Sequence, residues 1–254
     1  MRFFVFNKKQ LLFALAAAAV IAAVCITSGR SVMTFLVGSR EIPIYSVERP
    51  DNKIALTFDC AWNDDDIDEI ITVLKEKGCG ATFFVTGKWA EDYSGSLNKL
   101  YRAGFELGTH SYDHDDYTKM SADEIIADIE KTERAVTKAT GFTPRLMRAP
   151  SGAYNDNVVR TVEDSGRTYI QWSVDGIDYP EGTAAEDIYD RVVSQTKAGD
   201  IILLHNGTEH TAEVLPQILE ALTSEYELVT VSELIYTENY TIDRAGRQSQ
   251  RQIY

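Results

Sequence analysis

Short apolar runs alternate with longer amphipathic segments along the chain from residue 53 onward. The apolar runs are continuous rather than alternating, which is typical of strands buried on both faces, whereas segments of ten or more residues with a helical period favour helices. Strands are expected over 53–59, 81–87, 105–110, 145–150, 168–174, 200–206 and 226–231. Helices are expected over 65–77, 91–103, 121–140, the segment after 155, 184–197 and 211–224. This order predicts an α/β fold with a parallel sheet that closes into a (β/α)7-type barrel.

A different pattern occupies the N-terminus. Lys8 and Lys9 precede the apolar run "LLFALAAAAVIAAVCIT", and no charged residue follows until Arg30. Such a run predicts one transmembrane helix with the basic end inside, which would place the rest of the chain outside the cell membrane as a single-pass protein. A signal peptide that is cleaved before secretion is the alternative, because it shares the same features.

The domain organisation follows from these two patterns. Residues 1–29 are expected to form the membrane anchor or signal segment, 30–50 a stem, 51–236 the α/β domain and 237–254 a polar C-terminal tail. The membrane is therefore an expected partner through the N-terminal helix.

Charge narrows the partners further. The chain has 254 residues, with 25 Lys or Arg against 39 Asp or Glu and a net charge of −14. The first 40 residues contain five of the basic groups and no acid, so the α/β region is strongly acidic. Such a surface repels a phosphate backbone, and we expect no nucleic acid as a partner.

Polar side chains gather where the expected strands end, which is the edge where α/β barrels place their chemistry. These positions are Asp59, Cys60, Thr86, His110, Arg148, Trp172, Asp175, Asp178 and His205. His114 follows His110 by four residues, and this spacing alone suits either two ligands of one metal ion or a solvated pair on a loop.

Five short motifs occur in order along this region: "TFDCAW" at 57–62, "HSYDH" at 110–114, "RAPSGAY" at 148–154, "DGIDY" at 175–179 and "ILLH" at 202–205. On these motifs the chain resembles the polysaccharide deacetylase family, also called the NodB homology or carbohydrate esterase 4 group, from residue 53 to about 235. The resemblance implies a distorted barrel and the removal of acetyl groups from N-acetylated sugars with the help of a divalent metal.

The same resemblance implies a role for each motif residue. His110 and His114 would bind the metal, and Asp59 would be the general base that takes a proton from water. Arg148 would keep Asp59 charged. His205 would protonate the leaving amine, oriented by Asp178.

Four further residues are expected to bind the substrate. The backbone N–H of Tyr154 would donate to the developing oxyanion, and Trp172 and Leu203 would line the acetyl pocket. Trp62, with other aromatic residues near the rim, would stack on sugar rings.

Cys60 departs from the family pattern, which has an Asp metal ligand there. Three interpretations remain open. The first is a Cys60, His110 and His114 site with an open water position, which favours Zn²⁺ and predicts that Cys60→Asp raises activity and broadens metal choice. The second is a domain with altered or lost activity. The third, a disulfide to Cys79, is disfavoured because the two residues belong to opposite ends of neighbouring parallel strands, roughly 20 Å apart.

The sequence therefore predicts a Zn²⁺-dependent hydrolase that deacetylates a cell-wall or related glycan, either peptidoglycan or a chitin-like polymer. The alternative is a catalytically altered or inactive domain of the same fold that acts as an extracytoplasmic glycan-binding module.

Overall fold

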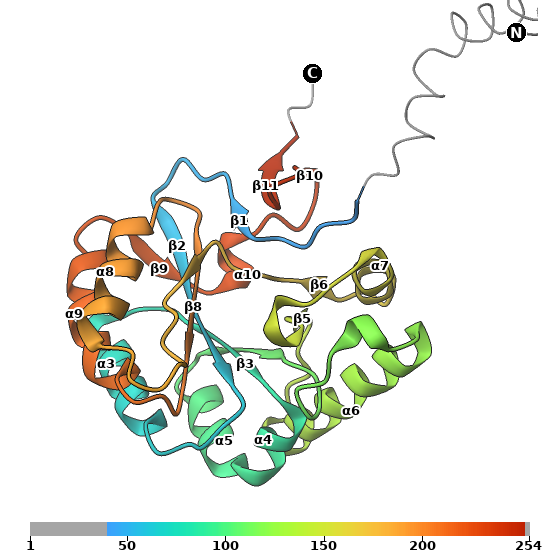
Figure 1. Cartoon of the computed structure of the whole chain (residues 1–254), viewed down its shortest axis with the longest axis horizontal. Helices are drawn as coiled ribbons and strands as arrows, with labels where there is room; N and C mark the ends of the chain where they lie inside the picture. The colour runs from blue at the N-terminus through green and yellow to red at the C-terminus, as the bar shows by residue number, and fades with distance from the viewer. Residues whose placement is uncertain (1–39, 252–254) are drawn as a thin grey trace, which may run out of the picture. The chain divides into compact units, whose positions relative to one another are not determined.

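The structure is a computed structural model that describes residues 40–251. Its centre is a curled, parallel eight-stranded sheet in the order β6-β5-β4-β3-β2-β8-β7, with β9 paired to the start of β2 (Figure 1). The strands are β2 Lys53–Cys60, β3 Thr82–Val85, β4 Glu106–Thr109, β5 Leu146–Met147, β6 Thr168–Tyr169, β7 Val174–Asp175, β8 Ile201–His205 and β9 Glu227–Val229. The predicted α/β class is confirmed. Closure is not complete, because β6 and β7 do not pair with each other within residues 40–251.

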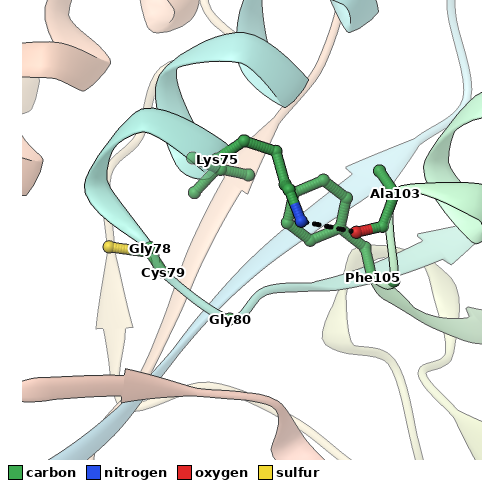
Figure 2. Close-up of a pocket in the computed structure, with 8 residues that line it drawn as sticks. Lys75, Gly78, Cys79, Gly80, Ala103 and Phe105 are labelled. Atoms are coloured by element: carbon green, nitrogen blue, oxygen red, sulfur yellow. Dashed lines mark hydrogen bonds between the residues drawn. The ribbon is translucent and has the colours of Figure 1, made fainter.

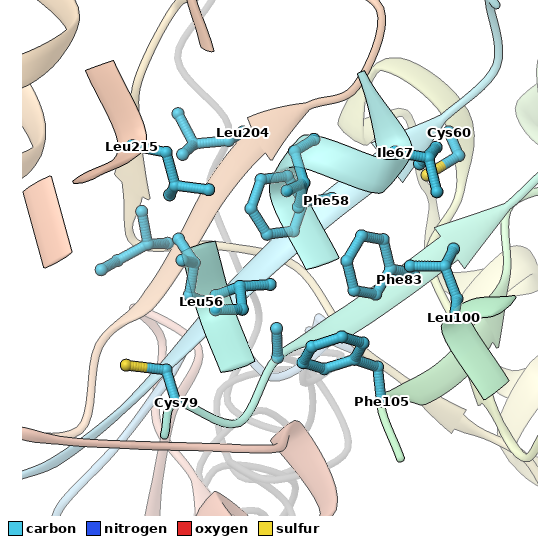
Figure 3. Packing of buried hydrophobic residues seen from close by; sticks show 14 of the residues in the cluster. Leu56, Phe58, Cys60, Ile67, Cys79, Phe83, Leu100, Phe105, Leu204 and Leu215 are labelled. Atoms are coloured by element: carbon cyan, nitrogen blue, oxygen red, sulfur yellow. The ribbon is translucent and has the colours of Figure 1, made fainter. Parts of the chain in front are cut away.

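Helices cover the outside of the curled sheet (Figure 1). They are α3 Ile67–Lys77, α4 Gly87–Asp92, α5 Ser94–Arg102, α6 Ala122–Thr140, α7 Asp156–Asp164, α8 Ala185–Gln195, α9 Thr211–Leu222 and α10 Val231–Leu234, with short 3-10 turns η1 Tyr117–Lys119 and η2 Pro150–Gly152. The main core lies between the sheet and these helices, where Leu56, Phe58, Phe83 and Leu215 pack together (Figure 3). Burial of this apolar surface is the main driving force that holds the helices on the sheet.

Two expected elements are divided in the structure. The expected strand 168–174 becomes β6 and β7, because the backbone N–H of Gln171 donates to Ile44 and that of Ser173 donates to Ile201, on opposite sides of the opening in the sheet. The expected helix 91–103 becomes α4 and α5, separated at Tyr93, and α4 begins earlier because the Thr86 side chain accepts from the backbone N–H of Trp89.

The expected stem and tail boundaries also differ from the structure. Ile44 bridges to Ile170 and Ser46 to Asp200, so this N-terminal segment lies across the open side of the sheet. Strand β1 Ser46–Val47 also pairs with β11 Arg247–Gln250, which forms a hairpin with β10 Tyr240–Ile242. Both ends of the described chain are therefore part of the folded domain.

The predicted membrane segment lies outside the described residues. Within 40–251, every helix is too short or too polar to cross a bilayer.

Candidate active site

A buried ion pair lies at the carboxyl end of β2. Arg148 Nη1 donates to Asp59 Oδ1 at 2.7 Å and to Thr57 Oγ1 at 2.9 Å, and Nη2 donates to the Gln171 carbonyl at 3.1 Å. The guanidinium is fully buried. Burial alone would raise the pKa of Asp59, but the opposite charge of Arg148 outweighs it, and the pKa lies below its ordinary value. Asp59 is therefore a carboxylate at neutral pH.

The two motif histidines lie beside this pair. The carbonyl of Arg148 is 2.9 Å from His110 Nδ1, so this nitrogen carries the proton that the carbonyl accepts. His110 Nε2 keeps its lone pair and lies 3.4 Å from Asp59 Oδ2. Burial lowers the pKa of His110 to about 4, so the ring is neutral at pH 7. The exposed His114 ring has its centroid 5.1 Å from that of His110.

The loop that carries His114 has an unusual backbone. Ser111 and His114 both adopt the left-handed conformation, with φ of 59° and 60°. Each such residue costs on the order of 1–2 kcal/mol when it is not glycine. Strain of this kind persists only where neighbouring contacts fix the loop. Here the Gly87 N–H donates to the Ser111 carbonyl, and the Asp115 N–H donates to Ser111 Oγ.

The donor set fits a metal in part. The neutral His110 ring and the nearby His114 ring are suitable ligands for a divalent ion. However, no three His, Cys, Asp or Glu side chains among residues 40–251 gather into a group that could hold a metal.

Cys60 does not join the histidines. Successive strand residues point to opposite faces, so Asp59 faces Arg148 while Cys60 lies fully buried in the apolar cluster with Ile67 and Leu100 (Figure 3). Burial raises the pKa of the Cys60 thiol well above its ordinary value, which disfavours the thiolate that binds metals. The structure gives no support to Cys60 as the third ligand. Both described cysteines are free thiols, so the disulfide interpretation has no support either.

The second half of the site is centred on His205. Its Nδ1 lies 2.7 Å from Asp178 Oδ1, and its backbone N–H donates to Asp178 Oδ2 at 2.7 Å. Thr211 Oγ1 also donates to this carboxylate. Burial alone would lower the pKa of His205, but the hydrogen bond and charge of Asp178 outweigh it and raise the pKa.

Strand register joins the two halves. Asp59 on β2 is the direct partner of His205 on β8, and Thr57 is the partner of Leu203. Partners in a parallel sheet point to the same face, so the carboxylate and the imidazole lie on one side of the sheet. This places an ionised carboxylate near an imidazole with a raised pKa.

Aromatic side chains surround His205 at the rim. The rings of Trp62 and Tyr179 each lie 5.4 Å from the His205 ring, and their exposed fractions are 47% and 54%. Trp172 is partly buried, and its Nε1 donates to Asp175 Oδ2. Tyr154 is half-buried and makes an edge contact with Tyr169. These surfaces suit the apolar faces of sugar rings.

Two supporting residues were missed in the sequence. Thr57 holds Arg148, and its position two residues before Asp59 on a strand already implied the same face. Thr211, which holds Asp178, had no local sequence signal, because it comes from the start of α9.

A cavity of about 170 Å³ lies at the opposite end of the sheet from this site, next to the start of β3 (Figure 2). Lys75 and Phe105 line it, and Lys75 Nζ donates to the Ala103 carbonyl. It contains none of the motif residues.

Comparison with known proteins agrees with the geometry. The family profile described as polysaccharide deacetylase matches residues 46–170. The peptidoglycan-N-acetylglucosamine deacetylase PgdA of Listeria monocytogenes is 35% identical over 211 residues, which is 83% of this chain and 44% of that protein. This chain thus spans less than half the length of that curated relative.

Two solved structures have the same fold. That of the peptidoglycan deacetylase PdaC from Bacillus subtilis has a TM-score of 0.67 and 32% identity, covering 73% of this chain and 90% of that one. That of a CE4 family pseudoenzyme from Bacillus anthracis has a TM-score of 0.72 and 31% identity, covering 76% of this chain and 69% of that one.

Proposed function

The chain belongs to the polysaccharide deacetylase family, and on this premise we propose that it hydrolyses the N-acetyl groups of a peptidoglycan or chitin-like glycan. The observation that supports this most is the register that pairs Asp59 with His205 across β2 and β8. It sets a base and an acid on one face, as amide hydrolysis requires.

Asp59 acts as the general base in this proposal. Its carboxylate is ionised because Arg148 lies 2.7 Å away, so it can accept a proton from the attacking water. His205 is the general acid. Its raised pKa, due to Asp178, keeps a proton available for the leaving amine.

His110 and His114 would hold a divalent metal, which we propose to be Zn²⁺ because this ion favours imidazole ligands. When bound, such a metal polarises the amide carbonyl and lowers the pKa of water. Cys60 is left out of the proposed ligands because its thiol lies in the core.

The substrate residues follow from the rim. Trp62 and Tyr179 would stack on sugar rings on either side of the scissile acetyl group. Trp172 and Leu203 would line the acetyl pocket, and the backbone N–H of Tyr154 would donate to the oxyanion. We further propose that the domain works outside the cell membrane, held by its N-terminal apolar segment, because peptidoglycan lies there.

The test is acetate release from N-acetylglucosamine oligomers and from peptidoglycan by the whole chain, before and after chelation. Asp59→Asn and His205→Gln should lower the rate at least about 100-fold. His210→Gln is the matched control and should keep full activity, because His210 is a surface residue paired with Glu213. Equal rates for all three variants would refute the assigned roles.

No third donor joins the two histidines among residues 40–251, and this favours one alternative, a glycan-binding module without turnover. A folded chain that binds the oligomers, with Trp62→Ala weakening the binding, but releases no acetate with added Zn²⁺ would establish that alternative.

A further inference from the structure

We infer that Asp128 on α6 is a positioning residue that fixes the loop carrying His114, and thereby sets the affinity of the site for a divalent metal. The inference rests on the proposed function, in which His114 is a ligand. Asp128 belongs to none of the five motifs and makes no hydrogen bond to His110 or His114.

Asp128 holds both ends of the loop with a single oxygen. Its Oδ1 accepts the backbone N–H of Tyr112 at 3.0 Å and the hydroxyl of Tyr117 at 2.5 Å. These residues lie on either side of His114. The carboxylate is buried, so water cannot easily replace either hydrogen bond.

Further contacts hold the same loop against α4, which packs beside α6. The Lys88 N–H donates to the Tyr112 carbonyl, and Tyr112 OH donates to Glu91 on α4. Lys131, one turn after Asp128, lies over the Tyr112 ring with its Nζ 3.2 Å from the centroid. Tyr112 thus occupies one fixed position between two helices.

The strained backbone explains why the loop needs this support. Ser111 and His114 are both left-handed, so a released loop would relax away from the observed conformation. His110 would stay in place, because it follows β4 and is held by the Arg148 carbonyl. Loss of Asp128 would therefore move the His114 ring away from the His110 ring, while His110 and Arg148 keep their positions.

The experiment measures Zn²⁺ binding by calorimetry for the whole chain and three variants, with thermal unfolding of each metal-free protein alongside. Asp128→Ala should weaken Zn²⁺ binding about tenfold or more, the range found when groups that orient metal ligands are removed. Asp128→Asn retains an acceptor oxygen at Oδ1 and should stay within about threefold of the wild type. Glu133→Gln is the control. Glu133 lies on the same helix as Asp128 and forms a buried ion pair with Arg167. Breaking this pair should lower the unfolding temperature and leave the Zn²⁺ affinity unchanged.

Three outcomes would overturn the inference, and they differ in what else they imply. Wild-type Zn²⁺ affinity in folded Asp128→Ala would refute the positioning role alone. No Zn²⁺ binding by the wild-type chain would refute the metal-dependent function together with it. An equal loss in Asp128→Asn and Asp128→Ala would show that the charge of Asp128 matters rather than its hydrogen bonds, which also contradicts the inference.

Discussion

Asp59 and Cys60 are neighbours in the sequence, yet their side chains lie in opposite environments. Asp59 meets a guanidinium and an imidazole, whereas Cys60 is buried in the apolar cluster of the core. The motif alone could not separate the two, because in the family both positions are acids that serve the site. The alternation of side chains along β2 would have suggested that only one of them faces Arg148.

This placement reverses the effect expected of Cys60→Asp. A carboxylate in the apolar cluster has no partner, so we expect the free energy of unfolding to fall by more than about 3 kcal/mol. Cys60→Ala should cost about 1–2 kcal/mol and leave Zn²⁺ binding unchanged. Urea denaturation and metal titration of both variants check this. A stable Cys60→Asp chain with higher activity would instead restore Cys60 to the ligand set.

His110 should make stability depend on pH in a defined window. Burial lowers its pKa to about 4, whereas an unfolded chain binds this proton at about 6.5. The unfolded state therefore binds more protons between these values, and stability is lost as the pH falls through them. The stability advantage of wild type over His110→Gln should shrink by about 2 kcal/mol from about pH 6.5 to about pH 4.5.

Urea denaturation in the presence of a chelator measures this difference. Wild type and His110→Gln both contain His205 with its raised pKa, so its contribution is common to the two proteins and cancels from the difference. A constant difference between the two proteins would mean that His110 titrates normally when folded.

At the scale of elements, the sequence predicted most of what the structure shows. The apolar run of β2 and the amphipathic pattern of α6 lie within one or two residues of their expected bounds. Local patterns failed where distant segments decide the outcome. The run 168–174 has the pattern of one strand, but residues in its middle donate hydrogen bonds to Ile44 on one side and to Ile201 on the other.

The candidate site divides in the same way. The residues of the five motifs were found because each follows a recognisable strand, and register then brings Asp59 and His205 to one face. Asp128 and Thr211 were not predicted, because each lies on a helix and forms its hydrogen bond with a residue of another segment of the chain. The apolar period of a helix predicts which of its faces is buried. It does not predict that an acid on that helix binds the backbone of a particular loop.

At the scale of the whole molecule, the two ends of the described chain stabilise each other. Gln248 is fully buried on β11, where its side chain accepts from the Tyr236 N–H and donates to the Tyr236 carbonyl. Its backbone carbonyl accepts the N–H of Glu48 from the N-terminal segment.

Removal of this amide should weaken the whole domain. Gln248→Ala leaves two backbone groups of Tyr236 without partners, and we expect a loss of about 2 kcal/mol in the free energy of unfolding. Gln250→Ala, at an exposed position on the same strand, should be neutral. Urea denaturation distinguishes them, and equal stability of the two variants would show that the C-terminal hairpin contributes little.

The segment across the open side of the sheet also affects the order of events during synthesis. Ile44 and Ser46 emerge early from the ribosome, but their partners are residues 170, 200 and 247. Long sequence separation between partners slows folding, because loop closure must come before these contacts form. The domain cannot complete its sheets until nearly the whole chain has been made. The nascent chain therefore stays incompletely folded through most of its synthesis.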